Sequence, residues 1–159
     1  MINLESIELI IGNSGRNFSG GTSITIQLLD YQEKEMNLAI LGSRFIPKNF
    51  TTLNYLQFLL LTRKKLPSGK LRVFYTRKNN EMIQGLIAKY IFRSKIKIIF
   101  SSSAQRNHTK FTKWLMSKMD SVVSTSRKAG NYLDKEPDKI ISHGIDLNRF
   151  SLPEDKDKA

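Results

Sequence analysis

The stretch "LRVFYTRKNNEMIQGLIAKYIFRSKIKIIFSS", residues 71–102, carries a strand signal, a helix signal and a second strand signal in direct succession. Its two ends, 71–76 and 95–102, are short runs rich in Val, Ile and Phe, which is typical of strands covered on both faces. Between them, residues 79–92 follow a helical period, with one apolar stripe formed by Met82, Leu86, Ile87, Tyr90 and Ile91. This order predicts two parallel strands that are joined by a right-handed helical crossover.

The same alternation continues on both sides of this unit. Apolar runs predict four more strands, at 6–12, 37–42, 121–126 and 138–144. Helical periods predict four more helices, at 22–35, 53–65, 107–118 and 126–133, and the third of these would bury Phe111, Trp114, Leu115 and Met119. The result is an α/β fold with a Rossmann-like, doubly wound parallel sheet. The 159 residues suit one such domain at 1–150, followed by a charged linker or frayed end at 151–159.

The composition limits the chemistry that the chain can perform. It contains no cysteine and two histidines, which excludes disulfides, thiolate zinc sites and cysteine nucleophiles and makes a poor metal site. We therefore expect neither a metal ion nor a cofactor. No apolar run reaches the roughly 20 residues that span a bilayer, and the N-terminus lacks the pattern of a signal peptide. We accordingly expect a cytoplasmic protein.

Positive charge is concentrated in the middle of the chain. Residues 51–118 hold fifteen Lys or Arg and a single acid, Glu81, whereas residues 1–50 and 119–159 each hold one more acid than base. The formal net charge of +12 therefore comes from the middle segment. Such a concentration indicates a polyanionic partner, which could be nucleic acid, an anionic membrane surface or a phosphorylated substrate. The alternative is a solvated basic face without a specific partner.

The first candidate site is the glycine-rich loop "GNSGRNFSGG", residues 12–21. Ligands of open parallel sheets bind at the carboxyl ends of the strands, and this loop follows the first predicted strand. Its four glycines, Gly12, Gly15, Gly20 and Gly21, permit positive φ and close backbone approach, and the N-terminus of the helix that starts near Thr22 attracts anions. The spacing matches neither a dinucleotide fingerprint nor a P-loop. A glycine turn that serves packing alone is the alternative.

The second candidate site is "TRKNNEM", residues 76–82, at the end of the strand at 71–76. Arg77 can bind a phosphate or carboxylate through two parallel hydrogen bonds. Asn79, Asn80 and Glu81 offer the donors and acceptors that sugars require. The alternative is a helix cap, in which Asn79 or Asn80 caps the helix and Glu81 lies in its first turn.

Two further polar stretches follow predicted strands. After 95–102, Arg106 and His108 gather with hydroxyl groups, but without the G-x-S-x-G elbow or the acid that would define a serine hydrolase. A structural role for His108 is the alternative there. After the last strand come His143, Gly144 and Asp146, where the glycine can turn backbone amides toward a ligand and the aspartate can accept from hydroxyls.

Together these stretches resemble the N-terminal domain of family-four retaining glycosyltransferases of the GT-B fold. The pair Gly20–Gly21 resembles that family's glycine loop, "MDSVVSTS" (119–126) its fifth-strand signature, and "HGIDLNRF" (143–150) the motif that closes the first domain. More narrowly, "RKNNEMIQGL" (77–86), "SSSAQRNHTKFTKWL" (101–115) and the same "MDSVVSTS" resemble the bacterial lipopolysaccharide core mannosyltransferases. The resemblance covers residues 7–152.

The resemblance implies the N-terminal half of a GT-B fold that holds the acceptor, while a C-terminal domain absent from this chain binds the sugar nucleotide. The complete enzyme would transfer mannose from GDP-mannose, with retention and without an obligatory metal, to the Kdo region of a lipid A precursor. This chain alone would then be inactive, either as a truncated enzyme or as one whose C-terminal half is encoded separately. Acceptor and cleft contacts would be Gly20, Gly21, Arg77, Asn79, Asn80, Glu81, Arg106 and His108, with His143, Gly144 and Asp146 on the interdomain side.

An acidic lipid acceptor would also explain the basic middle segment. The enzyme would then lie peripherally on the cytoplasmic face of the bacterial inner membrane. The stretch "YLQFLLLTRKKL", residues 55–66, combines basic and apolar side chains that suit contact with anionic lipid, although an ordinary amphipathic helix has the same pattern.

Two other hypotheses stay open. A nucleic-acid-binding module would agree with the pI of ≈ 10.0, but the sequence has few aromatic residues between its basic residues and no recognised motif. A non-functional remnant of a decayed glycosyltransferase gene would fold in the same way.

Overall fold

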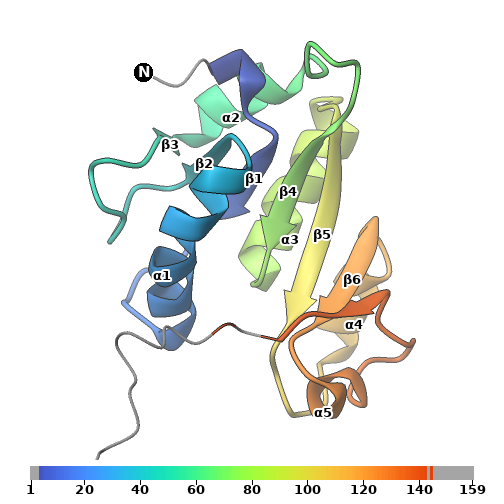
Figure 1. The fold of residues 1–159 in the computed structure, drawn as a ribbon. Helices are drawn as coiled ribbons and strands as arrows, with labels where there is room; N and C mark the ends of the chain where they lie inside the picture. Colours follow the sequence, from blue (N-terminus) through green and yellow to red (C-terminus); the bar gives the residue numbers. More distant parts are fainter. Residues whose placement is uncertain (1–3, 143, 145–159) are drawn as a thin grey trace, which may run out of the picture.

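The computed structural model describes residues 4–142 and residue 144 (Figure 1). Within them, seven strands form one sheet in the order β3-β2-β1-β4-β5-β6-β7, and every neighbouring pair is parallel. The strands are β1 (Leu9–Gly12), β2 (Leu38–Leu41), β3 (Thr52–Leu53), β4 (Arg72–Thr76), β5 (Ile96–Ser102), β6 (Ser121–Ser124) and β7 (Lys139–Ile140). The predicted α/β fold with a parallel, Rossmann-like sheet is confirmed. Strand β3 was not predicted, because two residues are too few to give a periodic signal.

All five predicted helices are present, with ends shifted by a few residues. They are α1 (Gly20–Glu35), α2 (Tyr55–Thr62), α3 (Asn79–Leu86), α4 (Lys110–Met116) and α5 (Arg127–Gly130). A short 3₁₀ helix, η1 (Leu4–Ser6), precedes the sheet, and a π-helical turn, η2 (Ile87–Ile91), continues α3. Within the described part of the chain, no helix combines the length and apolar character needed to cross a membrane.

The strand order reverses its direction between β1 and β4. The chain moves outward from β1 to β2 and β3 and then returns across the sheet, so that β4 pairs with the other side of β1, with Leu9 opposite Val73 and Ile11 opposite Tyr75. The loops after β1 and β4 therefore lead away from each other. In open parallel sheets, the crevice at such a point is where ligands bind.

The two faces of the sheet are covered by different helices. Alternate residues of β1 point to opposite faces: Ile10 packs in a cluster with Phe58 of α2 and Phe74 of β4, whereas Ile11 packs in a cluster with Leu29 of α1. Figure 1 shows α1 in front of the sheet and α3 behind it. A third cluster joins α3 and α4 to β5 through Met82, Phe100 and Leu115.

Helix α3 packs on the sheet with its small residues, which the sequence pattern did not predict. Gly85 faces the sheet so closely that a Cβ there would lie 2.9 Å from the Phe74 ring, and Met82 and Ala88 on the same side are fully buried. Tyr90 and Ile91 are instead 65% and 69% exposed. The predicted stripe was therefore wrong for these two residues, because they lie in the π-helical turn η2, whose wider period moves their side chains out of the stripe.

Helix α4 also buries fewer of its large side chains than the sequence predicts. Leu115 is buried against Met82 and Phe100, as predicted. Phe111 and Trp114 stack on each other at 6.1 Å between ring centroids and are both more than half exposed. Their predicted burial was wrong, because α4 packs on α3 and β5 through Leu115 and Met116 and leaves its opposite side exposed.

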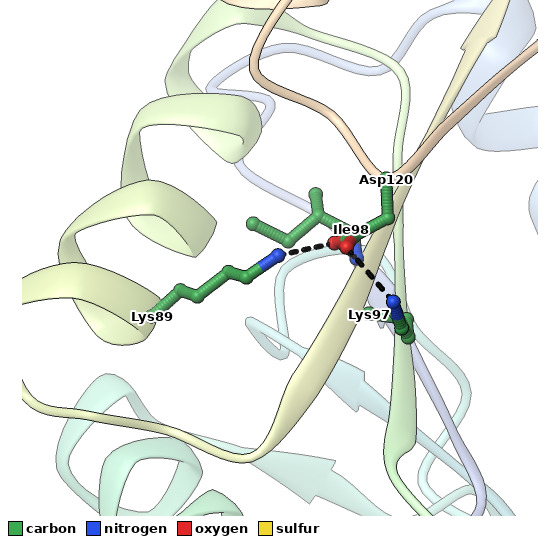
Figure 2. A network of polar contacts seen from close by, with 4 residues as sticks. All are labelled: Lys89, Lys97, Ile98 and Asp120. Carbon is green, nitrogen blue, oxygen red and sulfur yellow. Dashed lines mark hydrogen bonds and ion pairs between the residues drawn. The ribbon is translucent and has the colours of Figure 1, made fainter.

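A polar network ties η2, β5 and the start of β6 together (Figure 2). Oδ2 of Asp120 accepts hydrogen bonds from the Ile98 backbone N–H at 2.8 Å and from Lys89 Nζ at 2.6 Å, and Oδ1 accepts from Lys97 Nζ at 3.3 Å. Burial of the Asp120 carboxyl opposes its ionisation, but the hydrogen bonds from Lys89 and Ile98 outweigh that effect and hold its pKa below the ordinary value. The network lies at the amino ends of the strands, opposite the edge where ligands are expected.

Candidate functional site

A pocket of about 430 Å³ lies at the carboxyl edge of the sheet, where the strand order reverses. Ile11, Tyr75 and Ser101 contribute the ends of β1, β4 and β5, and one side of α1 closes the pocket. Its polar lining consists of Ser19, Thr25, Gln32, Arg77, Lys78, Ser101, Ser103 and Thr125. Of the predicted site residues, Gly20, Gly21 and Arg77 line this pocket.

The first turn of α1 forms one wall. Ser19 is the N-cap, and its hydroxyl accepts a hydrogen bond from the Thr22 backbone N–H at 3.4 Å. A Cβ added to Gly20 would have no neighbour within 4 Å, and one added to Gly21 would have none nearer than 3.8 Å. The N–H groups at the start of a helix lack partners within the helix, so open space beside them can receive an anion.

The loop glycines do not adopt the positive φ that their residue type permits. In the described part of the chain, glycines with positive φ are Gly42 and Gly69, neither of which belongs to residues 12–21. Close approach, the other expected use, does occur at Gly12, where a Cβ would lie 2.9 Å from the side chain of Glu81.

Arg77 fixes the position of α1 relative to β1. Its Nη1 donates to the Gly21 carbonyl at 2.6 Å and also to the Thr25 hydroxyl, and its Nη2 donates to the Gly12 carbonyl at 3.3 Å. The Nε atom is buried and has no partner among the described residues. Three acceptor oxygens, those of Gly21, Thr25 and Gly12, thus fix the orientation of the guanidinium in the wall of the pocket.

Glu81 lies beneath the pocket and is fully buried. Its Oε1 accepts from the backbone N–H and the hydroxyl of Ser14, both at 3.1 Å, and its Oε2 accepts from the backbone N–H of Arg77 at 2.7 Å and of Lys78 at 3.2 Å. One carboxylate therefore joins the loop after β1 to the turn after β4. Both carboxylate oxygens of Glu81 are therefore hydrogen-bonded to the protein itself, and Glu81 does not line the pocket.

The two asparagines lie at the start of α3, next to the pocket rather than in its wall. Lys78, not an asparagine, is the N-cap of α3, so the predicted cap by Asn79 or Asn80 was wrong. Asn79 Nδ2 instead donates to Thr112 Oγ1 at 2.8 Å, which connects α3 to α4, and Asn80 is exposed. Glu81 does lie in the first turn, as expected.

His108 lies beyond β5 and pairs with a serine. Its Nε2 is 3.2 Å from the buried Ser102 hydroxyl, and within the described residues no carboxylate hydrogen bonds to the ring. Burial and the positive charges of Arg106 and Lys113 lower the pKa of His108, while Asp134 opposes them, so the neutral ring is favoured. Arg106 is exposed, and neither residue lines the pocket.

The last predicted group is described in part. Gly144 is exposed, and a Cβ there would meet no atom within 4 Å. His143 and Asp146 lie outside the described residues. Among residues 4–142 and 144, no three His, Asp or Glu side chains cluster as metal ligands would.

An aromatic pair formed by the loops after β1 and β2 was not predicted. Phe18 and Phe45, 58% and 44% exposed, meet edge to face at 5.6 Å. The loops that carry them are joined, because Arg44 Nη1 donates to the Arg16 carbonyl at 2.8 Å and Asn13 Nδ2 to the Arg44 carbonyl at 2.9 Å. Phe45 has a φ of 65°, which is a strained value for a bulky side chain. The sequence signal was a phenylalanine in each of two polar loops, which periodicity does not detect.

A second pocket, of about 330 Å³, lies between the end of α4 and the start of β6. Asp120, Asp134, Glu136 and Asp138 line it together with Lys113 and Lys135. Lys113 forms an ion pair with Asp134 at 2.5 Å, and Ser121 donates to Asp138 at 2.7 Å. Asp120, Asp134 and Asp138 already have partners, and none of the predicted site residues lies there.

The fold and the pocket define a class: a Rossmann-like domain with a polar pocket at the reversal of its strand order. No protein-family model matches the chain, and no solved structure matches it significantly. Two bacterial proteins do. The chain is 37% identical over 155 residues to the lipopolysaccharide core biosynthesis mannosyltransferase LpcC of Rhizobium leguminosarum bv. viciae, and 35% identical over 161 residues to the lipopolysaccharide core biosynthesis mannosyltransferase LpsB of Rhizobium meliloti (strain 1021).

These similarities extend over 97% and 100% of this chain and over 43% and 45% of the two relatives. The resemblance to lipopolysaccharide core mannosyltransferases, predicted from residues 77–86 and 101–115, is therefore confirmed. The chain spans less than half the length of the relatives that it matches.

Proposed function

We propose that the chain is the acceptor-binding part of a glycosyltransferase that adds mannose to the inner core of a lipopolysaccharide precursor. The observation that carries this proposal is the pocket at the strand reversal, where Arg77 meets the open first turn of α1. The names of the two mannosyltransferase relatives supply the chemistry.

The pocket suits an acidic sugar such as Kdo. The N–H groups of Gly20 and Gly21 in the first turn of α1 offer donors to a carboxylate, and Arg77 and Lys78 add positive charge. The exposed rings of Phe18 and Phe45 offer an apolar surface on which the C–H groups of a sugar ring can pack. In this proposal, Glu81 and Arg77 hold the two loops in register and the acceptor binds above them.

The donor side of the reaction lies outside this domain. We propose that GDP-mannose binds to a second domain, which would correspond to the remaining length of the relatives, and that mannose is transferred with retention and without a metal ion. The described chain would then bind acceptor on its own but would not turn over, and it would act at the cytoplasmic face of the inner membrane.

Binding of a soluble Kdo disaccharide tests the acceptor proposal. In ¹H–¹⁵N NMR spectra of the full chain, we expect shifts at Ser19, Gly20, Gly21 and Ser101, and we expect Arg77→Gln to abolish them. Lys110→Gln, an exposed change on α4, is the matched charge control and should leave them intact. Equal shifts with an uncharged disaccharide, or none with the Kdo disaccharide, would contradict the proposal. Addition of the C-terminal part of a relative should then restore transfer to a Kdo-containing lipid, and absence of transfer would count against the reaction.

A further inference from the structure

We propose that Lys78 binds the anionic group of the acceptor, a carboxylate or a phosphate, and that Gly15 provides the space in which its ammonium group lies. This assignment rests on the proposed function and deepens it, because it concerns the charged contact within the same pocket. Two neighbouring cations then have two roles: Lys78 contacts the ligand, and Arg77 positions the wall beside it.

The guanidinium of Arg77 has little left to offer a ligand. Its Nη1 donates to the Gly21 carbonyl and to the Thr25 hydroxyl, and its Nη2 donates to the Gly12 carbonyl. Nε is buried and has no partner among the described residues, so a ligand in the pocket does not reach it. Of the five N–H groups of an arginine, only one on Nη2 is left for a ligand. Arg77 therefore acts by holding the first turn of α1 against the end of β1.

The ammonium group of Lys78, by contrast, has no anionic partner in the protein. Lys78 lines the pocket and is partly buried, and its side chain forms no ion pair among residues 4–142 and 144. Glu81, three residues further on, is fully buried and uses both oxygens to accept from Ser14 and from the backbone of Arg77 and Lys78. The charge of Lys78 is thus available to an anion in the pocket.

Gly15, in the loop after β1, determines where this ammonium group lies. A Cβ on Gly15 would lie 2.7 Å from Lys78 Nζ, which is closer than two such atoms can approach. The Lys78 side chain therefore extends from the start of α3 to the loop after β1 and occupies the space that a side chain at Gly15 would fill. A compact ammonium group fits this space, whereas the planar guanidinium of an arginine is larger.

The backbone on both sides of this contact is fixed by one carboxylate. Glu81 Oε2 accepts from the Lys78 backbone N–H at 3.2 Å, and Oε1 accepts from the backbone N–H of Ser14, the residue before Gly15, at 3.1 Å. The freedom that remains is in the four-carbon stem of Lys78. The ammonium group can therefore adjust to an anion while the residues that carry and receive it stay in place.

The rest of the pocket lining restricts the kind of anion. Ser101, Ser103 and Thr125 bring hydroxyl groups to the pocket from the ends of β5 and β6, and Ser19 brings another from the start of α1. Hydroxyl groups both donate and accept, as the hydroxyls of a sugar do. A ligand that fills this pocket therefore combines one anionic group for Lys78 with several hydroxyls, which is the chemistry of an acidic or phosphorylated sugar.

NMR titration of the full chain tests the assignment with three soluble probes. They are the Kdo disaccharide, its methyl ester, in which the carboxylates are neutral, and inorganic phosphate. Lys78→Gln should weaken binding of the disaccharide by about tenfold or more and leave binding of the ester unchanged, because only the charged form gains from the ammonium group. Gly15→Ala should also weaken binding of the disaccharide, since the new Cβ displaces Nζ. Lys118→Gln, an exposed change outside the pocket, is the charge control.

Two further variants separate contact from positioning. Arg77→Gln should weaken the disaccharide and the ester alike, because it releases the wall of the pocket. Lys78→Arg keeps the charge but not the fit, so it should bind the disaccharide more weakly than the native chain while binding still falls as salt rises. Glu81 bonds to the backbone of Lys78, so both Lys78 variants keep that bond and should unfold in urea as the native chain does.

The outcomes distinguish this assignment from the proposed function. Equal affinity of the native chain and Lys78→Gln for the disaccharide, or an equal loss for the ester, would overturn the role of Lys78 and leave the proposed function standing. If the native chain does not bind the disaccharide, the proposed function fails and phosphate decides on Lys78. Phosphate-induced shifts at Gly15, Gly20 and Gly21 that Lys78→Gln abolishes would support the assignment with phosphate as the anion. Shifts that survive the substitution, or no shifts at all, would overturn it.

Discussion

Ser14 and Glu81, 67 positions apart in the sequence, are joined twice: the backbone N–H and the hydroxyl of Ser14 both donate to Oε1 of Glu81 at 3.1 Å. The other oxygen of the same carboxylate accepts from the backbone of Arg77 and Lys78. Two loops that diverge from the sheet at the strand reversal are thereby fastened to one buried charged group. The geometry of the pocket depends on this group although the carboxylate does not line the pocket.

Replacing Glu81 by glutamine should destabilise the domain. An amide accepts hydrogen bonds on its oxygen only. Its NH₂ group would therefore face either the Ser14 donors or the donors of Arg77 and Lys78, and those donors would lose their acceptor. Leaving such donors buried and unpaired costs about 1–3 kcal/mol. Urea unfolding should show a loss of this size for Glu81→Gln, whereas the exposed change Glu136→Gln should be neutral. Equal stability of both variants would show that the loops do not depend on this carboxylate.

Alanine at Gly12 and at Gly20 should have opposite effects. A Cβ at Gly12 would lie 2.9 Å from two carbon atoms of Glu81, a side chain that its hydrogen bonds hold in place, and such overpacking costs about 1–3 kcal/mol. A Cβ at Gly20 meets open space in the first turn of α1, where alanine stabilises a helix by about 0.5–1 kcal/mol relative to glycine. Thermal unfolding of the two variants measures both effects. A lower unfolding temperature for Gly20→Ala than for the native chain would mean that the first turn of α1 has no room for a Cβ.

The order of strands and helices could be predicted because periodicity is a local property of the sequence. The pairing at Glu81 could not, since its four donors come from two loops that the fold brings together. Periodicity predicted the inward side of α3 at Met82 but not at the end of the helix. The 3.6-residue period stops at the π-helical turn η2, where Tyr90 and Ile91 are exposed. Contact between distant elements decided the first case, and a local change of helix type decided the second.

Asp120 should make the stability of the domain sensitive to acid. Its pKa is lower in the folded protein than in the unfolded chain, so its stabilising effect is fully present above the ordinary value of 3.8 and is lost as the pH falls through the lower folded pKa. Asp120→Asn should therefore unfold at lower urea than the native chain at pH 7, and the difference should disappear in strong acid. Asp134→Asn, at a side chain that is 60% exposed, is the control. A difference that is constant with pH would contradict the assignment.

His108 should titrate below its ordinary pKa of 6.5 in the folded chain. Burial and the nearby Arg106 and Lys113 disfavour the charged ring, so stability is present above pH 6.5 and falls as the pH drops through the folded pKa. NMR titration of the ring protons should show a higher pKa in Arg106→Gln and no change in Lys118→Gln. If Arg106→Gln leaves the titration unchanged, the charge of Arg106 does not reach the ring.

The strained backbone at Phe45 gives a test that separates stability from binding. Phe45→Ala and Phe45→Gly both remove the ring that meets Phe18, but only glycine adopts a φ of 65° without a steric penalty. The glycine variant should therefore be more stable than the alanine variant by about 1 kcal/mol in urea unfolding, because the left-handed region costs an L-residue about 1–2 kcal/mol. Both variants should bind the Kdo disaccharide more weakly than the native chain, since both lack the ring. If the glycine variant is more stable than the alanine variant but binds the disaccharide as well as the native chain does, Phe45 serves only to join the two loops. If both variants bind more weakly than the native chain, whatever their difference in stability, the ring lies at the acceptor.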